Sequence, residues 1–130
     1  MDSLNKQNSL THFIVGASRG IGRSLVDQSI QSGHSVTALS RTPPTEPTTG
    51  CNWITGNATE TETFLDQLPE TINALTFCPG KVILGPVKRL KPEQMLEAYQ
   101  TSVLDAFTLI QTLLPRLEGS LVFISSVAAT

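Results

Sequence analysis

The sequence predicts a doubly wound α/β fold, in which helices cover both faces of a parallel sheet to give three layers. Apolar runs of strand length alternate with segments of helical period, and this alternation requires right-handed crossovers between parallel strands. A cluster of glycines stands between the first strand and the first helix. The length of 130 residues and the hydrophobic content of 39% fit one globular domain.

The beginning of the chain supplies two strands and one helix. Residues 12–15 (HFIV) form the first predicted strand, which leads into the glycine cluster at residues 16–22. The next segment is helical and ends near Gly33, which provides a left-handed stop. Its apolar face consists of Ile21, Leu25, Val26 and Ile30. Residues 35–40 (SVTALS) form the second strand.

The middle of the chain adds two more strands. A Pro/Thr-rich loop at residues 41–50 precedes a short third strand at residues 51–55 (CNWIT). Thr59 and Glu62 resemble a capping box, which predicts a short helix that ends at Pro69. The helix is expected to bury Phe64, Leu65 and Leu68. Residues 72–77 (INALTF) form the fourth strand.

The last part of the chain predicts a long helix and a fifth strand. Pro92 stands where the first turn of a helix tolerates proline, and the helix ends near Pro115. Its apolar stripe consists of Met95, Leu96, Tyr99, Val103, Phe107, Ile110, Leu113 and Leu114, and Tyr99 is expected to pack within it. Gly119 and Ser120 then turn the chain into a strand at residues 121–125 (LVFIS). The predicted strand order is 3-2-1-4-5.

The charge balance argues against several classes of partner. Nine Lys and Arg residues oppose eleven Asp and Glu residues, so the net charge is −2. Such a chain has no positive electrostatic field that would attract nucleic acid or an anionic membrane. The first eight residues do not resemble a signal peptide, and no run reaches ~18 apolar residues. We therefore expect a cytoplasmic protein with no nucleic-acid or membrane partner.

The two cysteines predict neither a metal site nor a disulfide. Cys51 and Cys78 are too few and too far apart for a zinc site. The third strand begins at Cys51, whereas Cys78 stands at the end of the fourth, directly after residue 77, so the two lie on opposite rims of the predicted sheet. Both are expected to be small buried residues in a reducing compartment.

The glycine cluster, Gly16, Gly20 and Gly22, predicts a binding site for a diphosphate. Unpaired backbone N–H groups at a helix N-terminus bind such an anion best when no side chains stand in the way. The last glycine also lets the helix approach the sheet closely. The position between a strand and a helix favours a dinucleotide site over a plain tight turn. A P-loop is excluded, because Ala17 replaces its first glycine and Arg23 its lysine.

The end of the second strand predicts which dinucleotide binds. An acidic residue there would bind the ribose 2′-hydroxyl of NAD, whereas a basic residue accommodates the 2′-phosphate of NADP. The chain has Ser40 and Arg41 at this place, and no acidic residue lies between Asp27 and Glu46. Arg19 in the glycine loop supplies a second cation. NADP is the predicted cofactor, and the alternative is that Arg41 is a solvated loop residue.

These residues resemble the short-chain dehydrogenases/reductases, which have the Rossmann fold. GASRGIG at residues 16–22 matches their Gly-x-x-x-Gly-x-Gly loop, and Ser40-Arg41 is similar to the NADP-preferring form of their second strand. LVFISSVA at residues 121–128 is similar to the strand that delivers their catalytic serine, which implies that Ser126 hydrogen-bonds the substrate carbonyl. The cofactor-binding residues are expected to be Gly16, Ser18, Arg19, Gly20, Ile21, Gly22, Ser40, Arg41, Asn57, Ala58, Cys78, Pro79 and Gly80.

Several positions depart from the pattern of the family. Asn57 stands where an Asp usually contacts the adenine. The segment FCPG at residues 77–80 replaces Asn-Asn-Ala-Gly and keeps only Gly80, which lets the backbone pass near the ribose. Ser102 occupies the place of an Asn that supports a proton-relay water, so it is a second candidate catalytic residue beside Ser126.

The resemblance also implies a pair that the sequence does not contain. In the family a Tyr-x-x-x-Lys pair follows the serine strand, and its Tyr protonates the carbonyl oxygen. No such pair occurs up to Thr130, and Tyr99 has no Lys four residues later. We therefore expect residues 1–130 to be the N-terminal, NAD(P)-binding part of a longer chain, truncated after the fifth strand and inactive alone. Part of the helix stripe, the fifth strand and one sheet face should be exposed.

The predicted function is that of an NADP-dependent oxidoreductase, which transfers a hydride between NADPH and a carbonyl or alcohol substrate. Two alternatives remain. A noncatalytic NADP-binding sensor or scaffold of the same fold is favoured by the altered residues Cys78 and Ser102. An association module would pair the helix at residues 92–114 with a second subunit, as the equivalent helix commonly does in the family. By this resemblance a homo-oligomer is expected.

Overall fold

The computed structural model describes residues 9–46, 48–80 and 83–124. Within them, five parallel strands form one sheet in the order β3-β2-β1-β4-β5, which confirms the predicted topology. Each strand is a short run that contains β-branched or aromatic residues, which favour strand structure. The strands are β1 (Thr11–Val15), β2 (Ser35–Ser40), β3 (Cys51–Thr55), β4 (Ile72–Phe77) and β5 (Leu117–Phe123).

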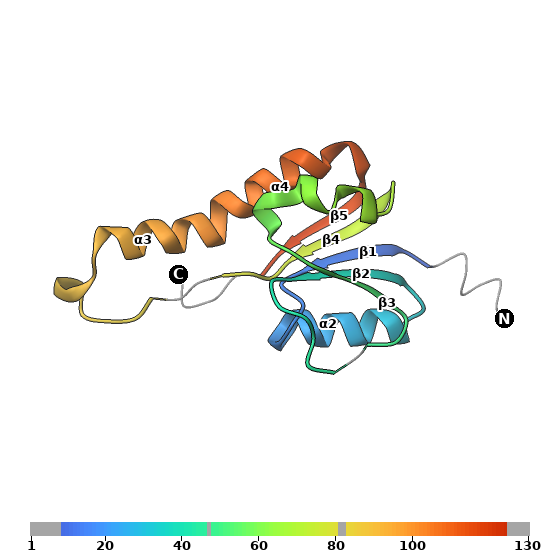
Figure 1. Cartoon of the computed structure of the whole chain (residues 1–130), viewed down its shortest axis with the longest axis horizontal. Helices are drawn as coiled ribbons and strands as arrows, with labels where there is room; N and C mark the ends of the chain where they lie inside the picture. Colours follow the sequence, from blue (N-terminus) through green and yellow to red (C-terminus); the bar gives the residue numbers. More distant parts are fainter. Residues whose placement is uncertain (1–8, 47, 81–82, 125–130) are drawn as a thin grey trace.

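Helices cover both faces of the sheet, as predicted for three layers. Helix α2 (Gly20–Gln31) lies on one face. Helix α4 (Asp105–Leu113) and the 3₁₀ turns η1 (Ala58–Thr63) and η2 (Leu65–Gln67) lie on the other (Figure 1). This doubly wound arrangement brings the carboxyl ends of all five strands to one edge, which is where ligands bind in such folds.

The core consists of two apolar clusters, one on each side of the sheet. Alternation along β1 divides its side chains between them, because successive strand residues point to opposite faces. Phe13 and Val15 belong to the cluster under α4, where Leu109 is fully buried. Ile14 belongs to the cluster under α2, where it meets Val26. The central strands are thus buried on both faces, as a parallel sheet requires.

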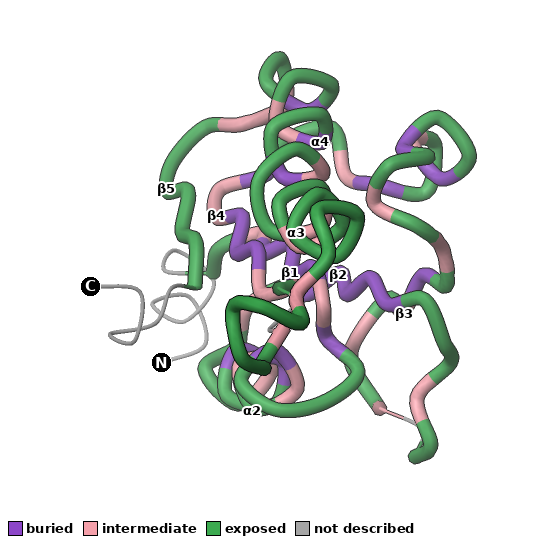
Figure 2. The backbone as a smooth tube through the Cα atoms, turned by 90° about the vertical axis from the view of Figure 1, so that its left-hand side faces the viewer, coloured by how far each residue is buried: buried purple, intermediate pink, exposed green. Residues whose placement is uncertain are grey.

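The first half of the long C-terminal helix is exposed. Helix α3 (Pro92–Tyr99) continues through a π-helical turn, η4 (Gln100–Leu104), into α4. Helix α3 projects past the carboxyl ends of the strands and is exposed along its length (Figures 1 and 2). Leu96 is 67% exposed and Tyr99 is 53% exposed. The expectation that Tyr99 packs within this part of the chain is therefore wrong.

The exposure expected of the stripe and of the fifth strand is confirmed. Phe107 in α4 is 58% exposed, and Phe123 in β5 is 48% exposed. The ring of Phe77 is tilted by 51° against that of Phe123, and the two ring centres lie 6.2 Å apart. Among the described residues, no helix combines the length and apolar character needed to cross a membrane.

Two local predictions need correction. The segment after β3 forms 3₁₀ turns, and Asn57 caps them by accepting the amide of Thr59, so Thr59 is not the cap. Strand β5 begins at Leu117, and Gly119 lies inside it instead of forming a turn. A Cβ on Gly119 would come within 2.0 Å of the carbonyl oxygen of Asn73, so glycine permits the irregular pairing of β5 with β4 at this point.

Candidate cofactor-binding site

The glycine loop crosses the carboxyl ends of β2 and β4. Gly16 has a φ of +81°, a conformation that favours glycine. The amides of Gly16 and Ala17 both donate to the carbonyl of Leu39, at 2.9 and 3.2 Å. On the other side, a Cβ on Gly16 would lie 2.9 Å from Cδ of Pro79. The loop is therefore held between the end of β2 and the segment that follows β4.

The N-terminus of α2 packs directly on this loop. A Cβ on Gly22 would lie 2.1 Å from the carbonyl oxygen of Gly16, which no ordinary contact permits. Gly20 differs from Gly22, because a Cβ on Gly20 would meet no atom within 4 Å. The glycines thus have two roles. Gly22 lets helix and loop touch, and Gly20, with a φ of +63°, leaves open space beside the helix end.

No acidic side chain in the first turn of α2 competes for the backbone N–H groups at the start of the helix. The first helical bond into the loop runs from the amide of Arg23 to the carbonyl of Arg19 at 3.4 Å, so the amides of Gly20, Ile21 and Gly22 precede it. Arg19 is the N-cap, its side chain makes no capping bond, and the first turn contains no acidic residue. This donor set fits a diphosphate, which needs several N–H groups and the positive end of a helix dipole.

One residue of α2 lies differently from its predicted place. Ile21 was expected on the buried face of the helix, together with Val26. Val26 is fully buried, but Ile21 is 61% exposed in the first turn. Ser18 and Arg19 are also exposed beside it. An apolar side chain at the open edge of the loop has no partner in the core, which makes it available to a bound ligand.

The end of β2 separates a buried residue from an exposed cation. Ser40 is 5% exposed, and its hydroxyl donates to the carbonyl of Thr42 and accepts from Nε1 of Trp53 at 2.8 Å. The next residue, Arg41, is exposed and pairs with no acidic residue in the described part of the chain. The hydroxyl of Ser40, expected on the cofactor, is thus used to hold the strand end.

The segment after β4 meets both the loop and the long helix. The amide of Cys78 donates to the carbonyl of Val15 at 3.0 Å, which ties this segment to the end of β1. A Cβ on Gly80 would lie 3.9 Å from Oγ of Ser102, which the π-helical turn η4 presents. The structure therefore brings the predicted ribose-binding glycine and the predicted relay serine together. Burial raises the pKa of the Cys78 thiol, so the thiol stays protonated at neutral pH.

The remaining predicted residues fall in two groups. Asn57 and Ala58 follow β3 at the same edge of the sheet, and Oδ1 of Asn57 accepts from both the amide and the hydroxyl of Thr59. Its carboxamide therefore has a structural role as well. Ser126 lies outside the described residues, so the structure does not place it.

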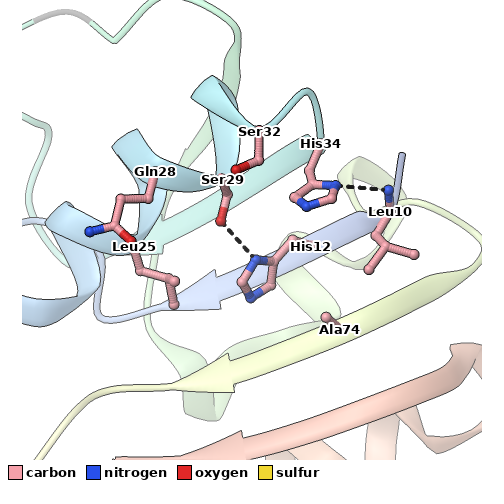
Figure 3. A pocket seen from close by; sticks show the side chains of 8 residues that line it. All are labelled: Leu10, His12, Leu25, Gln28, Ser29, Ser32, His34 and Ala74. Carbon is pink, nitrogen blue, oxygen red and sulfur yellow. Dashed lines mark hydrogen bonds between the residues drawn. The ribbon is translucent and has the colours of Figure 1, made fainter. Parts of the chain in front are cut away.

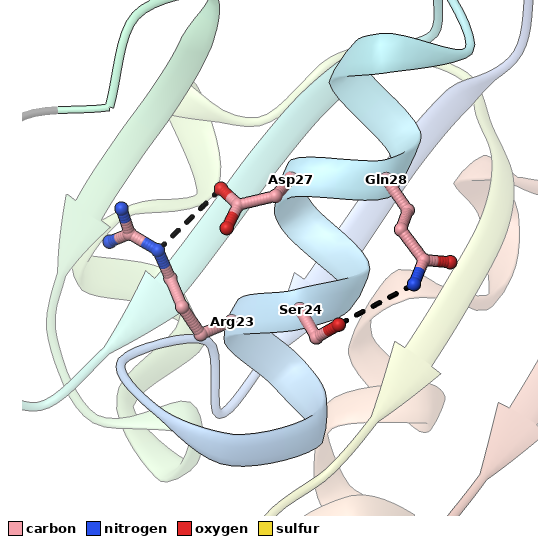
Figure 4. A network of polar contacts seen from close by, with 4 residues as sticks. All are labelled: Arg23, Ser24, Asp27 and Gln28. Carbon is pink, nitrogen blue, oxygen red and sulfur yellow. Dashed lines mark hydrogen bonds and ion pairs between the residues drawn. The ribbon is translucent and has the colours of Figure 1, made fainter.

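Sequence reasoning missed two residues at this edge. Trp53 bonds to Ser40, and the guanidinium of Arg23 lies 5.5 Å from the centre of the Trp53 ring. Arg23 also pairs with Asp27 at 3.6 Å, and Gln28 and Ser24 form a second contact along the same helix (Figure 4). The alternation of β3 could have placed Trp53 on the α2 face, but only the strand register shows that it reaches Ser40.

A pocket of about 290 Å³ lies at the opposite end of α2, away from the glycine loop. His12 borders it from β1, and its ring bonds to the hydroxyl of Ser29 at 3.1 Å (Figure 3) and to that of Thr76 at 2.8 Å. The pKa of His12 is lowered, first by burial and then by the nearby His34. His34 accepts the amide of Leu10 at 3.0 Å. These bonds join helix and sheet, so the pocket belongs to the packing of α2.

Comparisons with known proteins agree with this geometry. Residues 11–130 match the family model described as short chain dehydrogenase. A carbonyl reductase from Pseudomonas aeruginosa PAO1 in complex with NADP is 28% identical, with a TM-score of 0.82 over 95% of this chain and 61% of that one. The ligand-free aldohexose dehydrogenase from Thermoplasma acidophilum is 20% identical, with a TM-score of 0.81 over 97% of this chain and 52% of that one.

A third structure carries the other nicotinamide cofactor. A short chain dehydrogenase from Leptospira borgpetersenii with bound NAD+ is 20% identical, with a TM-score of 0.68 over 79% of this chain and 44% of that one. The chain thus spans 44% to 61% of the length of these three structures. No curated protein sequence matches it. On the match of the family model to residues 11–130, the chain belongs to the short chain dehydrogenase family of oxidoreductases.

Proposed function

We propose that this chain binds NADP(H) and serves hydride transfer between the nicotinamide and a carbonyl or alcohol substrate. The observation that carries the proposal is the arrangement at the carboxyl edge of the sheet. The open N-terminus of α2 lies beside the end of β2, where Arg41 stands exposed and without an ion pair in the described part of the chain. An acidic residue at this place would instead select NAD.

Each part of the edge has a role in this proposal. The amides of Gly20, Ile21 and Gly22 bind the diphosphate, and Gly16 and Ser18 form the loop around it. Arg41 and Arg19 hold the 2′-phosphate, because a guanidinium offers two parallel N–H donors to phosphate oxygens.

The rest of the cofactor lies along the segments that follow β3 and β4. Asn57 and Ala58 border the adenine, and Cys78, Pro79 and Gly80 pass beside the ribose. The bound nicotinamide supplies the hydride, and the protein supplies orientation and polarity. Ser102 holds a water near Gly80 for proton transfer, because a hydroxyl can bond to more than one partner. Ser126 orients the substrate carbonyl.

The solved structures support the reaction class more than the choice of cofactor. The carbonyl reductase from P. aeruginosa, at 28% identity, was solved with NADP, whereas the L. borgpetersenii dehydrogenase was solved with NAD+. The choice therefore rests on Arg41 and Arg19 of this chain. Their positive charge favours the cofactor with the additional phosphate.

The experiment that tests the proposal replaces Arg41 with Asp and measures binding of NADPH and NADH through nicotinamide fluorescence. Loss of a charge-assisted bond costs about 1.5–3 kcal/mol, which corresponds to about 10- to 150-fold weaker binding of NADPH. NADH should lose little, because it has no 2′-phosphate. Lys88→Asp is the matched control, since Lys88 is an exposed cation in the 3₁₀ turn η3 (Val87–Arg89). Equal losses for both cofactors would contradict the role of Arg41.

A second candidate function is self-association through the long helix. The specific observation is the exposure of its apolar side chains, with Leu96 at 67% and Phe107 at 58%. Exposed apolar area of this kind favours association. Sedimentation of the chain and of Phe107→Glu tests it. Association that weakens in the variant supports this role, and a monomer at all concentrations contradicts it.

A further inference from the structure

We propose that Trp53 is a positioning residue that sets the preference for NADPH over NADH, because it fixes the turn that carries Arg41. The inference rests on the proposed function, since it assigns to Arg41 the 2′-phosphate of the cofactor. Trp53 itself does not touch the cofactor. It acts through Ser40, the residue that immediately precedes Arg41.

The chemistry of the three groups fixes the direction of their hydrogen bonds. An indole Nε1 can only donate, so Ser40 must accept from Trp53, at a distance of 2.8 Å. The single proton of the Ser40 hydroxyl is then directed to the carbonyl of Thr42, which its Oγ contacts. The two residues on either side of Arg41 are thereby joined. A side chain that bonds two residues ahead closes a turn, so the backbone of Arg41 is held in one conformation.

The anchor of this turn is rigid on the strand side. Ser40 is 5% exposed and pairs with Thr55 in the register of β2 and β3. Its carbonyl accepts the amide of Gly56 at 2.9 Å. A buried residue with both backbone and side chain bonded moves little, so the position of Arg41 depends on whether the hydroxyl of Ser40 is correctly oriented.

The indole is in turn held against α2. The guanidinium of Arg23 lies 5.5 Å from the centre of the ring, a cation–π contact. Arg23 is kept in place by Asp27, one turn later, with Nε and Oδ1 at 3.6 Å (Figure 4). Trp53 thus bridges the helix whose N-terminus would bind the diphosphate and the turn whose cation would bind the 2′-phosphate. The bridge fixes the separation of the two phosphate subsites.

This bridge affects the two cofactors unequally. NADPH engages both subsites, whereas NADH engages only the diphosphate subsite. A merely structural role of Trp53 would weaken both cofactors alike through the stability of the fold. A positioning role lowers the ratio of NADPH affinity to NADH affinity and leaves NADH binding nearly unchanged.

The test measures this ratio in the full chain for three variants. Trp53→Phe keeps an aromatic ring and removes only the Nε1 donor, and Ser40→Ala keeps the indole and removes the hydroxyl. The third variant carries both changes. Nicotinamide fluorescence reports binding in all of them, since it does not depend on Trp53. Each single change should lower the ratio about two- to tenfold, the effect of one hydrogen bond, and the double variant should fall no further than Ser40→Ala.

Asn52→Ala is the matched control. It removes a bond from Nδ2 to the carbonyl of Gln67 at 3.3 Å from the neighbouring position of β3, away from Arg41, so the ratio should not change. An unchanged ratio in Trp53→Phe and Ser40→Ala, or equal losses for both cofactors, overturns the positioning role while the proposed function stands. If the unaltered chain binds NADPH no better than NADH, the proposed cofactor is wrong and this inference fails with it.

Discussion

Replacing Gly22 with Ala tests whether close packing of α2 on the glycine loop builds the diphosphate site. The new Cβ would lie 2.1 Å from the carbonyl oxygen of Gly16 and 2.9 Å from its carbon, and both atoms are backbone. A contact of 3.4 Å requires that helix and loop separate by about 1.3 Å. The overlap lowers the free energy of unfolding by about 1–3 kcal/mol, and the better helix propensity of Ala offsets about 1 kcal/mol of this loss.

The more informative effect is on binding. A shift of about 1 Å moves the amides of Gly20 and Ile21 out of reach of the diphosphate, so the affinity for NADPH and for NADH should fall together by about 100-fold. Urea unfolding measures the stability of the variant, and nicotinamide fluorescence measures its affinity for the two cofactors.

Gly33→Ala is the matched control for this change. Gly33 lies just past the other end of α2, has a φ of +84°, and would place its Cβ in open space. The left-handed backbone destabilises the Gly33→Ala variant by about 1–2 kcal/mol, which is similar to the loss of stability expected for Gly22→Ala. Cofactor affinity should remain that of the unaltered chain. A Gly22→Ala variant that binds both cofactors normally would refute the packing argument.

Two further predictions follow from the shifted pKa values. The pKa of His12 is lowered in the folded state, so the unfolded chain binds the proton more readily. The free energy of unfolding should therefore keep its full value above pH 6.5 and fall as the pH drops below 6.5. Urea unfolding across this range should show a smaller pH dependence for His12→Asn, and an identical slope would contradict the assignment. Burial raises the pKa of the thiols of Cys51 and Cys78, so both should react slowly with a thiol reagent at neutral pH. Bound NADPH should slow labelling of Cys78 and leave Cys51 unaffected, whereas equal protection would place the cofactor elsewhere.

The fold could be predicted from local signals because each strand is a short apolar run with clear breaks. The bounds of β2, β3 and β4 agree with those expected from the sequence. The predicted start of β5 was wrong, and the reason is physical. Gly119 is a turn signal in the sequence, but in the sheet its missing Cβ permits close approach to Asn73, a long-range contact that local patterns do not contain.

The candidate site was predictable only where one continuous segment forms it. The loop from Gly16 to Gly22 is such a segment, and its conformation follows from its glycines and from the helix that begins there. The bond between Trp53 and Ser40 depends instead on the register of two strands. The sequence could therefore name Arg41 as a cation at the edge, but not the residues that hold its turn in place.

In the proposed function, the amides at the start of α2 bind the diphosphate of a nicotinamide dinucleotide. Amide chemical shifts, recorded while NADPH is added to the full chain, show whether these amides bind the cofactor. We expect the largest changes at Gly20, Ile21 and Gly22, with a further change at Arg41 that NADH does not produce. If the chemical shifts of these four amides do not change at saturating cofactor, the proposed diphosphate site is wrong.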